Sequence, residues 1–359
     1  MNAKSGAFGG IGRALDSRNF VLYCGGLGIA LTGTFVFFVA LGWITWELTH
    51  SAAWVGGIVM AETLPNAVIS PLAGVIIDRT SARRALFWSQ FLSAIVMVLL
   101  TVVTLNDWIT IEILLLFALV LGSLNGISFP AHFAIMPRLV PREDLTAAIA
   151  FQSSVSQAAR FLGPAFAGII IVWAGVGMAF ALNSVTYIAF LAALAVIRID
   201  EGRGDGPASR GVVLDMAAGL KYAWSSISIR LLLIVAVALG ILLRPIVELM
   251  PAYVGRVLEG DAAALAWLLA SAGAGAMLAS LWLAWRGATQ GLTRIMSIYA
   301  LTVRAIPAFG AFMAGQLADR LGIVPTFLGG AIAGLVFWIW IRRNTGRNNI
   351  AQRIEAPRT

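Results

Sequence analysis

Glu62 is an acidic residue inside a long apolar stretch, between Ala61 and Thr63. An ionised carboxylate in hydrocarbon costs on the order of several kcal/mol, so we expect this group to be protonated, paired or exposed to a wet cavity. A carboxyl group in such a place can take up and release a proton, or recognise a cation. The alternative is a structural carboxyl group that is hydrogen-bonded to a neighbouring helix.

Two arginines, Arg160 and Arg304, also lie in apolar stretches, and a proline follows each of them within four residues. A guanidinium group stays charged at any accessible pH, so each arginine requires a carboxylate, helix carbonyl groups or an anionic ligand. A structural ion pair and a contact with a ligand both remain open. The similar surroundings of the two arginines, in residues 151–168 and 297–315, indicate a weak internal repeat.

Arg244 and Glu248 carry opposite charges and are four residues apart in a further apolar stretch. This spacing places both side chains on one face of a helix. They either neutralise each other or form part of a gate or a proton relay.

The densest charge cluster of the chain lies between two apolar runs and contains Asp78, Arg79, Arg83 and Arg84, although only 12% of the residues are charged. Charges next to apolar helices are tolerated where the backbone reaches water. Gly74, four residues before the aspartate, would let two helix ends approach each other closely. The alternative is a basic turn that only fixes the orientation of the neighbouring helices.

The elements that must position these side chains are membrane-spanning helices. Hydrophobic residues make up 60% of the chain, and its mean hydropathy is +0.89. Repeated apolar runs of about 20 residues are each long enough to cross roughly 30 Å of hydrocarbon as a helix. Strands of a barrel alternate in polarity, which these runs do not. The chain is therefore predicted to be an all-α, polytopic membrane protein. The ten predicted spans are 20–46, 52–77, 85–105, 109–134, 146–172, 176–198, 230–254, 262–285, 295–317 and 323–341.

The basic residues predict the orientation of these spans. With the N-terminus in the cytoplasm, 20 of the 25 basic residues lie on the cytoplasmic side and only Arg256 and Arg320 lie on the other. Both termini are therefore predicted to be cytoplasmic. The net charge of +8 follows from this topology, so the lipid bilayer is the expected partner and nucleic acid is not.

The chain divides into two unequal parts. Residues 1–199 are predicted to form a bundle of six helices, and 200–229 a Gly-rich, charged cytoplasmic linker. Residues 230–343 are predicted to form a shorter bundle of about four helices, and 344–359 a basic cytoplasmic tail. Two helical bundles are typical of transporters built from repeats, with the substrate site at their interface.

Catalytic chemistry has little support. The chain has two histidines, His50 and His132, and one cysteine, Cys24. It has no His-Glu-x-x-His pair, Gly-x-Ser-x-Gly elbow or Walker loop. No enzyme activity, metal or cofactor is expected, and the energy for any transport would come from an ion or substrate gradient.

Several segments resemble the major facilitator superfamily of transporters, and most closely its bacterial exporter branch, which includes the enterobactin exporter and macrolide efflux proteins. The resemblance begins in the charged loop at 74–84 and continues through 139–145, 160–164 and 183–187. It implies a location in the bacterial cytoplasmic membrane. It also implies that the charged loop acts as a cytoplasmic clamp between the two bundles.

The same resemblance bears on two further features. Gly163, Pro164 and Gly168 are similar to part of the antiporter signature of the fifth span, which implies export. Members of the superfamily typically have twelve spans, whereas residues 285–294 here join the eighth family span to the region before the eleventh. Two spans of the second half are therefore predicted to be missing.

Two hypotheses follow for the function. The first is a secondary active transporter that exports an amphipathic small molecule, a drug or a siderophore, by alternating access, with protons as the coupling ion and Glu62 as the acid. The second is a transport-incompetent remnant or a membrane assembly protein. Tryptophans near span ends, among them Trp43, Trp46 and Trp173, are predicted to be interfacial anchors. Trp43 is alternatively part of a pocket for a bulky substrate.

Overall fold

The computed structural model describes residues 9–79, 81–197, 227–285 and 296–346. The first part of the chain forms helices separated by short turns. Serine and threonine side chains begin three of them: Ser17 accepts a hydrogen bond from the backbone N–H of Phe20, and Ser81 and Thr110 act in the same way. The helices are α1 (Gly9–Asp16), α2 (Arg18–Thr49), α3 (Ala52–Arg79), α4 (Ala82–Leu105), α5 (Ile111–Ile135) and α6 (Leu145–Val196).

The second part begins with a broken helix. The segment made of α8 and α9 is bent by 44° from α10, close to Pro245 and Pro251. A turn at Gly322, whose φ is +92°, separates the last two helices. The helices are α8 (Ile227–Leu242), α9 (Arg244–Glu248), α10 (Met250–Arg256), α11 (Ala262–Trp285), α12 (Met296–Leu321) and α13 (Ile323–Gly346).

Helices lie over all ten predicted spans, within the described residues. The fifth and sixth spans are the two arms of α6, which is divided at Gly175 with φ +82°. Five of the described helices are long and apolar enough to cross a membrane, or six if the bent pair of α8–α9 and α10 counts as one span. The all-α membrane fold is therefore confirmed. Most of the predicted linker and tail lies outside the described residues.

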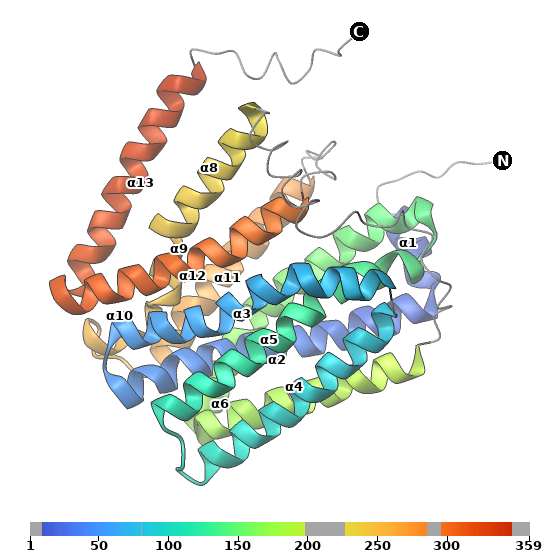
Figure 1. Cartoon of the computed structure of the whole chain (residues 1–359), viewed down its shortest axis with the longest axis horizontal. Helices are drawn as coiled ribbons and strands as arrows, with labels where there is room; N and C mark the ends of the chain where they lie inside the picture. Colours follow the sequence, from blue (N-terminus) through green and yellow to red (C-terminus); the bar gives the residue numbers. More distant parts are fainter. Residues whose placement is uncertain (1–8, 80, 198–226, 286–295, 347–359) are drawn as a thin grey trace.

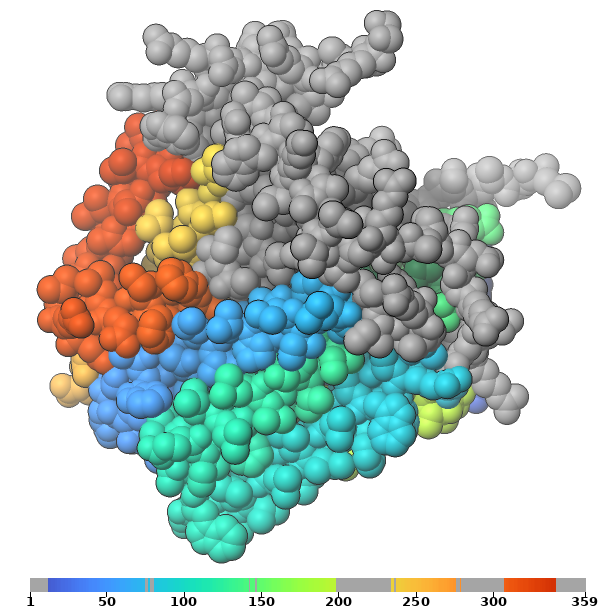
Figure 2. Space-filling model, in the orientation of Figure 1, coloured from blue at the N-terminus to red at the C-terminus, as the bar shows by residue number. Residues whose placement is uncertain are grey.

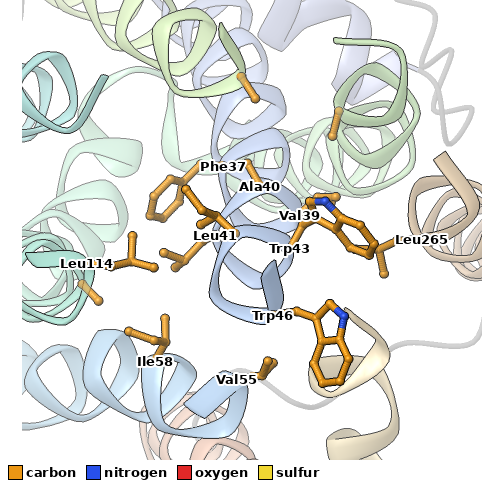
Figure 3. Packing of buried hydrophobic residues seen from close by; sticks show 14 of the residues in the cluster. Phe37, Val39, Ala40, Leu41, Trp43, Trp46, Val55, Ile58, Leu114 and Leu265 are labelled. Atoms are coloured by element: carbon orange, nitrogen blue, oxygen red, sulfur yellow. The ribbon is translucent and has the colours of Figure 1, made fainter. Parts of the chain in front are cut away.

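The main hydrophobic core is built around the second half of α2, with residues from α3, α4, α5, α6, α10 and α11. Figure 3 shows Phe37, Leu41, Ile58 and Leu114 packed around the end of α2. Trp43 and Trp46 belong to this buried cluster, with exposed fractions of 7% and 5%. The prediction that these two indoles are interfacial anchors was wrong, because the end of α2 packs against α10 and α11 and not against lipid. Other tryptophans, such as Trp173, are exposed.

Two crossings join the first part of the chain to the second. Helix α12 packs along α3, and α11 packs along α6. Figures 1 and 2 show α12 directly beside α3. Helices α8, α12 and α13 also contact one another.

Glycines allow the backbones to meet at these crossings. A Cβ at Gly56 of α3 would lie 2.5 Å from the carbonyl oxygen of Ala311, and a Cβ at Gly315 would lie 2.5 Å from that of Ala52. On α11, a Cβ at Gly273 would lie 3.0 Å from the carbonyl oxygen of Arg160. The helices therefore touch through their backbones, as small residues permit in membranes.

Gly122 gives a direct test of this packing. A Cβ at this position in α5 would lie 1.9 Å from the carbonyl oxygen of Glu62 in α3, so Gly122→Ala must separate the two helices. Overpacking of this kind costs about 1–3 kcal/mol. We expect a lower thermal midpoint for the monodisperse protein in detergent, measured by size exclusion after heating. Gly57→Ala is the control, since no described atom lies within 4 Å of a Cβ there. Equal midpoints for the two variants would contradict this packing.

Candidate functional site

Glu62 lies about midway along α3 and is 8% exposed. Its carboxylate accepts hydrogen bonds from Asn125 Nδ2 on α5, at 3.1 Å, and from Thr63 Oγ1, at 3.2 Å. The close approach of Gly122 to the Glu62 backbone brings α5 near enough for the first of these bonds. In this conformation the carboxyl group is therefore held by a neighbouring helix.

A second group of buried polar side chains lies around Tyr187, inside the first six helices. The charge of Glu62 acts on the buried phenol of Tyr187, and the side chains of Thr34 and Ser93 also interact with this phenol. These groups come from α2, α4 and α6. Polar side chains of these helices thus pair with one another inside the first six helices.

Arg160 lies midway along the first arm of α6 and is exposed. Its guanidinium carbon stands 5.4 Å from the ring centroid of Phe35 on α2. At this distance a cation is attracted to the face of an aromatic ring. Within the described part of the chain, no carboxylate lies within ion-pair distance of Arg160. The side chain of Arg304, its counterpart in the repeat, is not among the described ones.

Arg244 and Glu248 form an ion pair, with 3.0 Å between Nε and Oε1. The predicted four-residue spacing thus brings them together on α9. The arginine side chain remains 43% exposed and that of the glutamate 25%.

The charged loop is only partly described, because the side chains of Asp78 and Arg79 lie outside the described set. Arg83 donates hydrogen bonds to the carbonyl oxygens of Leu194 and Ala195 at the end of α6, at 3.1–3.3 Å. It therefore caps the end of α6, where carbonyl groups are left without intrahelical partners.

Two further residues of the loop, Gly74 and Arg84, are described. The backbone N–H of Arg84 donates to Ser81 Oγ in the cap of α4, and the Arg84 side chain is exposed. No described atom lies within 4 Å of a Cβ placed at Gly74. The close helix approach expected at Gly74 is therefore not seen among the described residues.

The antiporter-like motif lies in the packed part of α6. A Cβ at Gly163 would lie 2.3 Å from the Cβ of Phe35 on α2, and a Cβ at Gly168 would lie 2.3 Å from that of Ala266 on α11. Pro164, inside the helix, is buried between them. Gly163 thus allows α6 to pack closely against α2, and Gly168 allows it to pack closely against α11.

A set of contacts that the sequence did not predict joins helices of the first and second parts of the chain at one end of the molecule. We call this the distal end; it carries the turn between α2 and α3 and the turn between α12 and α13. Asp319, in the last turn of α12, accepts hydrogen bonds from Ser51 Oγ and from the backbone N–H groups of Ala52 and Ala53, the latter two at 3.0 Å. A carboxylate here satisfies orphan donors and complements the positive end of the α3 dipole.

Arg256, at the end of α10, completes the distal contact. Its guanidinium group lies 3.3 Å from Asp319 Oδ1 and donates at 2.9 Å to the carbonyl oxygen of His50. The same group stands 5.5 Å from the ring centroid of Trp46. Helices from both parts of the chain are therefore tied together at this end.

The pKa of Asp319 lies below its usual range. Burial acts to raise it, but the hydrogen bonds from Ser51, Ala53 and Ala52 and the charge of Arg256 outweigh burial. A carboxylate with a lowered pKa stabilises the contact above its usual pKa, and this contribution is lost as the pH falls through the lowered value. The distal contact is therefore expected to be intact at neutral pH and weakened only in strong acid.

The helices of this chain form a fold of the major facilitator type. Two solved structures share the fold. A mutant of the nucleoside transporter NupG is 11% identical, with a TM-score of 0.60 over 87% of this chain and 97% of that one. A bacterial homologue of the human lysosomal transporter Spinster, in an inward-facing and unoccupied conformation, is 13% identical, with a TM-score of 0.54 over 93% and 86%.

The chain belongs to the transmembrane secretion effector family of this superfamily, whose model it matches over residues 21–287. The superfamily consists of transporters and not of enzymes. The family match ends at the segment where two spans were predicted to be missing.

Three relatives are named as transporters. The staphyloferrin A transporter of Staphylococcus aureus is 29% identical over 39% of this chain and 35% of its own length. The multidrug efflux pump Tap of Mycolicibacterium fortuitum is 24% identical over 78% and 69%. The putative bacilysin exporter BacE of Bacillus subtilis is 28% identical over 38% and 33%. The match thus spans about a third of the length of two of these relatives.

Proposed function

We propose that the chain is a secondary active transporter of the bacterial cytoplasmic membrane, with both termini in the cytoplasm, and that it exports an amphipathic small molecule in exchange for protons. The names of two relatives, a multidrug efflux pump and a putative bacilysin exporter, support export of small molecules, and a third relative is named as a staphyloferrin A transporter. Residues 1–199 would act as one bundle and residues 230–343 as the shorter second one. The antiporter-like motif at Gly163, Pro164 and Gly168 fits the same direction.

The observation that carries the proton coupling is the position of Glu62. It is a carboxyl group midway along a membrane helix, nearly buried, with Asn125 as a hydrogen-bond donor. Movement of α3 relative to α5 would remove that donor, which stabilises the charged form, and so favour protonation. A change of conformation and a change of protonation are then linked, as exchange with protons requires.

Alternating access also needs contacts that exist in one state and break in the other. The distal contact of Asp319 with the start of α3 is such a contact, because it joins helices of the two proposed bundles by hydrogen bonds at the helix ends. On the opposite side, the charged loop with Asp78, Arg79, Arg83 and Arg84 would serve as the second clamp in the outward-facing state. The described structure then corresponds to the state that is closed at the distal side.

Export can be tested with purified chain in proteoliposomes that carry an imposed pH gradient, acidic inside. We expect uptake of a fluorescent amphipathic dye into these vesicles, and loss of uptake when an ionophore collapses the gradient. Protein-free vesicles supply the baseline. Dye uptake that equals this baseline, with the protein shown to be inserted, would contradict the proposal.

A transport-incompetent remnant is the second candidate, and it has one specific observation in its favour. The match spans 69% of the length of the multidrug efflux pump Tap, and among the described residues the second part of the chain has fewer helices long and apolar enough to cross a membrane than the first. Insertion of the two absent spans from a full-length relative between residues 285 and 294 separates the candidates. Uptake that appears only after this insertion would favour the remnant.

A further inference from the structure

We infer that His132 is a second proton-binding group of the transporter, at the cytoplasmic end of a column of polar side chains that leads along α5 from Glu62. The inference rests on the proposed function, because it adds a step to the path by which protons would reach that carboxyl group. His132 lies in the last turn of α5, and the short helix η1 (Met136–Arg138) follows directly. The topology predicted from the basic residues places this end of α5 on the cytoplasmic side.

The imidazole ring of His132 is held by two other helices. Its Nδ1 lies 2.7 Å from the phenol oxygen of Tyr23 on α2, and its ring stacks on that of Phe190 on α6, with 5.7 Å between the centroids. Both partners are fully buried. A hydroxyl group can donate a hydrogen bond to a neutral ring nitrogen or accept one from a protonated ring. The contact with Tyr23 therefore holds the imidazole in place in both of its protonation states.

A column of polar side chains connects His132 with Glu62. Asn125, which donates to the Glu62 carboxylate at 3.1 Å, lies seven residues before His132 on α5. Seven residues are two helical turns, roughly 10 Å, and bring both side chains to the same face. Ser128 lies between them on this face, and its hydroxyl donates to Ser89 Oγ on α4 at 2.8 Å. Polar groups thus follow one another along α5 at intervals of three and four residues.

The middle of this column is buried and polar. Ser128, Ser89 and Gln90 are 3%, 2% and 6% exposed, and Gln90 Nε2 donates to Ser128 Oγ at 3.4 Å. Gln90 Oε1 is buried and has no hydrogen-bond partner among the described residues. Buried groups of this kind bond with internal water. Side chains at these intervals have Cβ atoms about 5–6 Å apart, a gap that one bridging water molecule spans. The column can therefore carry a proton between His132 and Glu62.

The charged and titratable groups around this end come from the elements that pack against α5, which are α2, α3, α4 and η1. Within the described side chains, these groups are Arg18, Tyr23 and Cys24 on α2, Arg83 and Arg84 on α4, and Arg138 on η1. On α3, Glu62 lies farther along the column. Arginine, tyrosine and cysteine ordinarily titrate above pH 8, whereas histidine changes its charge between pH 5 and 8. A proton bound at this end in that range is therefore assigned to the imidazole.

The test follows the protonation of His132 directly, by NMR of full-length protein with isotope-labelled histidine in phosphatidylcholine nanodiscs. The chain has two histidines, so His50→Asn leaves one labelled ring. Asparagine tolerates the positive φ of 49° at this position. We expect the ring nitrogens of His132 to titrate between pH 5 and 8.

Glu62→Gln in this background tests the connection along the column. The midpoint of the His132 titration should move to lower pH by about one unit, because the imidazolium loses a negative charge roughly 10 Å away. Glu112→Gln is the matched control; it removes an exposed acid at the opposite end of α5 and should leave the midpoint unchanged.

Transport separates a proton-carrying role from a structural one, with radiolabelled ethidium as the probe. In proteoliposomes, His132→Asn should slow export driven by a pH gradient by about tenfold or more. Exchange of ethidium at equal pH on both sides should stay close to normal, because it needs no net transfer of protons.

Four results would overturn the inference. They are one protonation state of His132 from pH 5 to 8, an unchanged midpoint in Glu62→Gln, normal proton-driven export by His132→Asn, and loss of both export and exchange in that variant, which would show a structural role. Absence of ethidium export by the unmodified protein would count against the proposed function separately, since the titration is measured without a transported molecule.

Discussion

Replacement of Glu62 with glutamine is expected to abolish proton-driven export. Glutamine has nearly the same shape and can keep a hydrogen bond with Asn125, but it cannot take up or release a proton. Uptake of dye into acid-loaded proteoliposomes should fall to the protein-free baseline, at least a tenfold loss, while thermal stability remains close to that of the unmodified protein. The measurement is the initial rate of uptake at a fixed pH gradient.

Two further variants make this result specific. Glu62→Asp keeps an acid at the site and should retain part of the activity with a shifted pH profile. Glu112→Gln removes an exposed acid at the start of α5 and should have no effect. If Glu62→Gln transports at the normal rate, the carboxyl group is structural, as its hydrogen bond to α5 would also allow.

The second large effect is expected at the distal contact. Asp319→Ala removes the acceptor for Ser51, Ala52 and Ala53 and leaves Arg256 without its carboxylate. A hydrogen bond to a charged group contributes ~1.5–3 kcal/mol, so loss of the set should shift the equilibrium between closed and open distal ends by about tenfold or more. The distal end should then be open in a larger fraction of molecules.

Spin labels on two exposed positions measure this shift. Cysteines at Trp54 on α3 and Leu321 on α12, in a Cys24→Ala background, report the distance across the distal end. We expect one short distance in the parent protein and an added longer population in Asp319→Ala. Arg320→Gln removes the adjacent exposed charge and serves as the control. An unchanged distance distribution in Asp319→Ala would show that the contact does not hold the distal end closed.

Local patterns in the sequence predicted the helices and one of the charged contacts. Apolar length predicted helices over all ten spans, because hydrocarbon leaves the backbone few alternatives. The four-residue spacing of Arg244 and Glu248 predicted their pairing, because neighbours on a helix face meet whatever the rest of the fold does.

Contacts between distant helices were not predictable in this way. Asp319 and Ser51 are 268 residues apart in sequence. No periodicity in the sequence indicates that Asp319 caps α3, the helix that begins directly after Ser51. A signal was nevertheless present, because Asp319 and Arg256 are oppositely charged residues predicted on the same side of the membrane. Trp46 was misplaced for the same reason: its position at the end of a span indicated lipid, but α10 covers it.

In the proposed mechanism, the chain moves an amphipathic molecule across the membrane only in exchange for protons. This mechanism is tested by proteoliposomes that contain a pH-sensitive dye and are given only a gradient of the exported probe, with no initial pH difference. The probe gradient should drive protons in the opposite direction, and Glu62→Gln should remove this proton movement. Probe movement without any pH change in the unmodified protein would contradict proton exchange, and absence of probe movement would contradict transport itself.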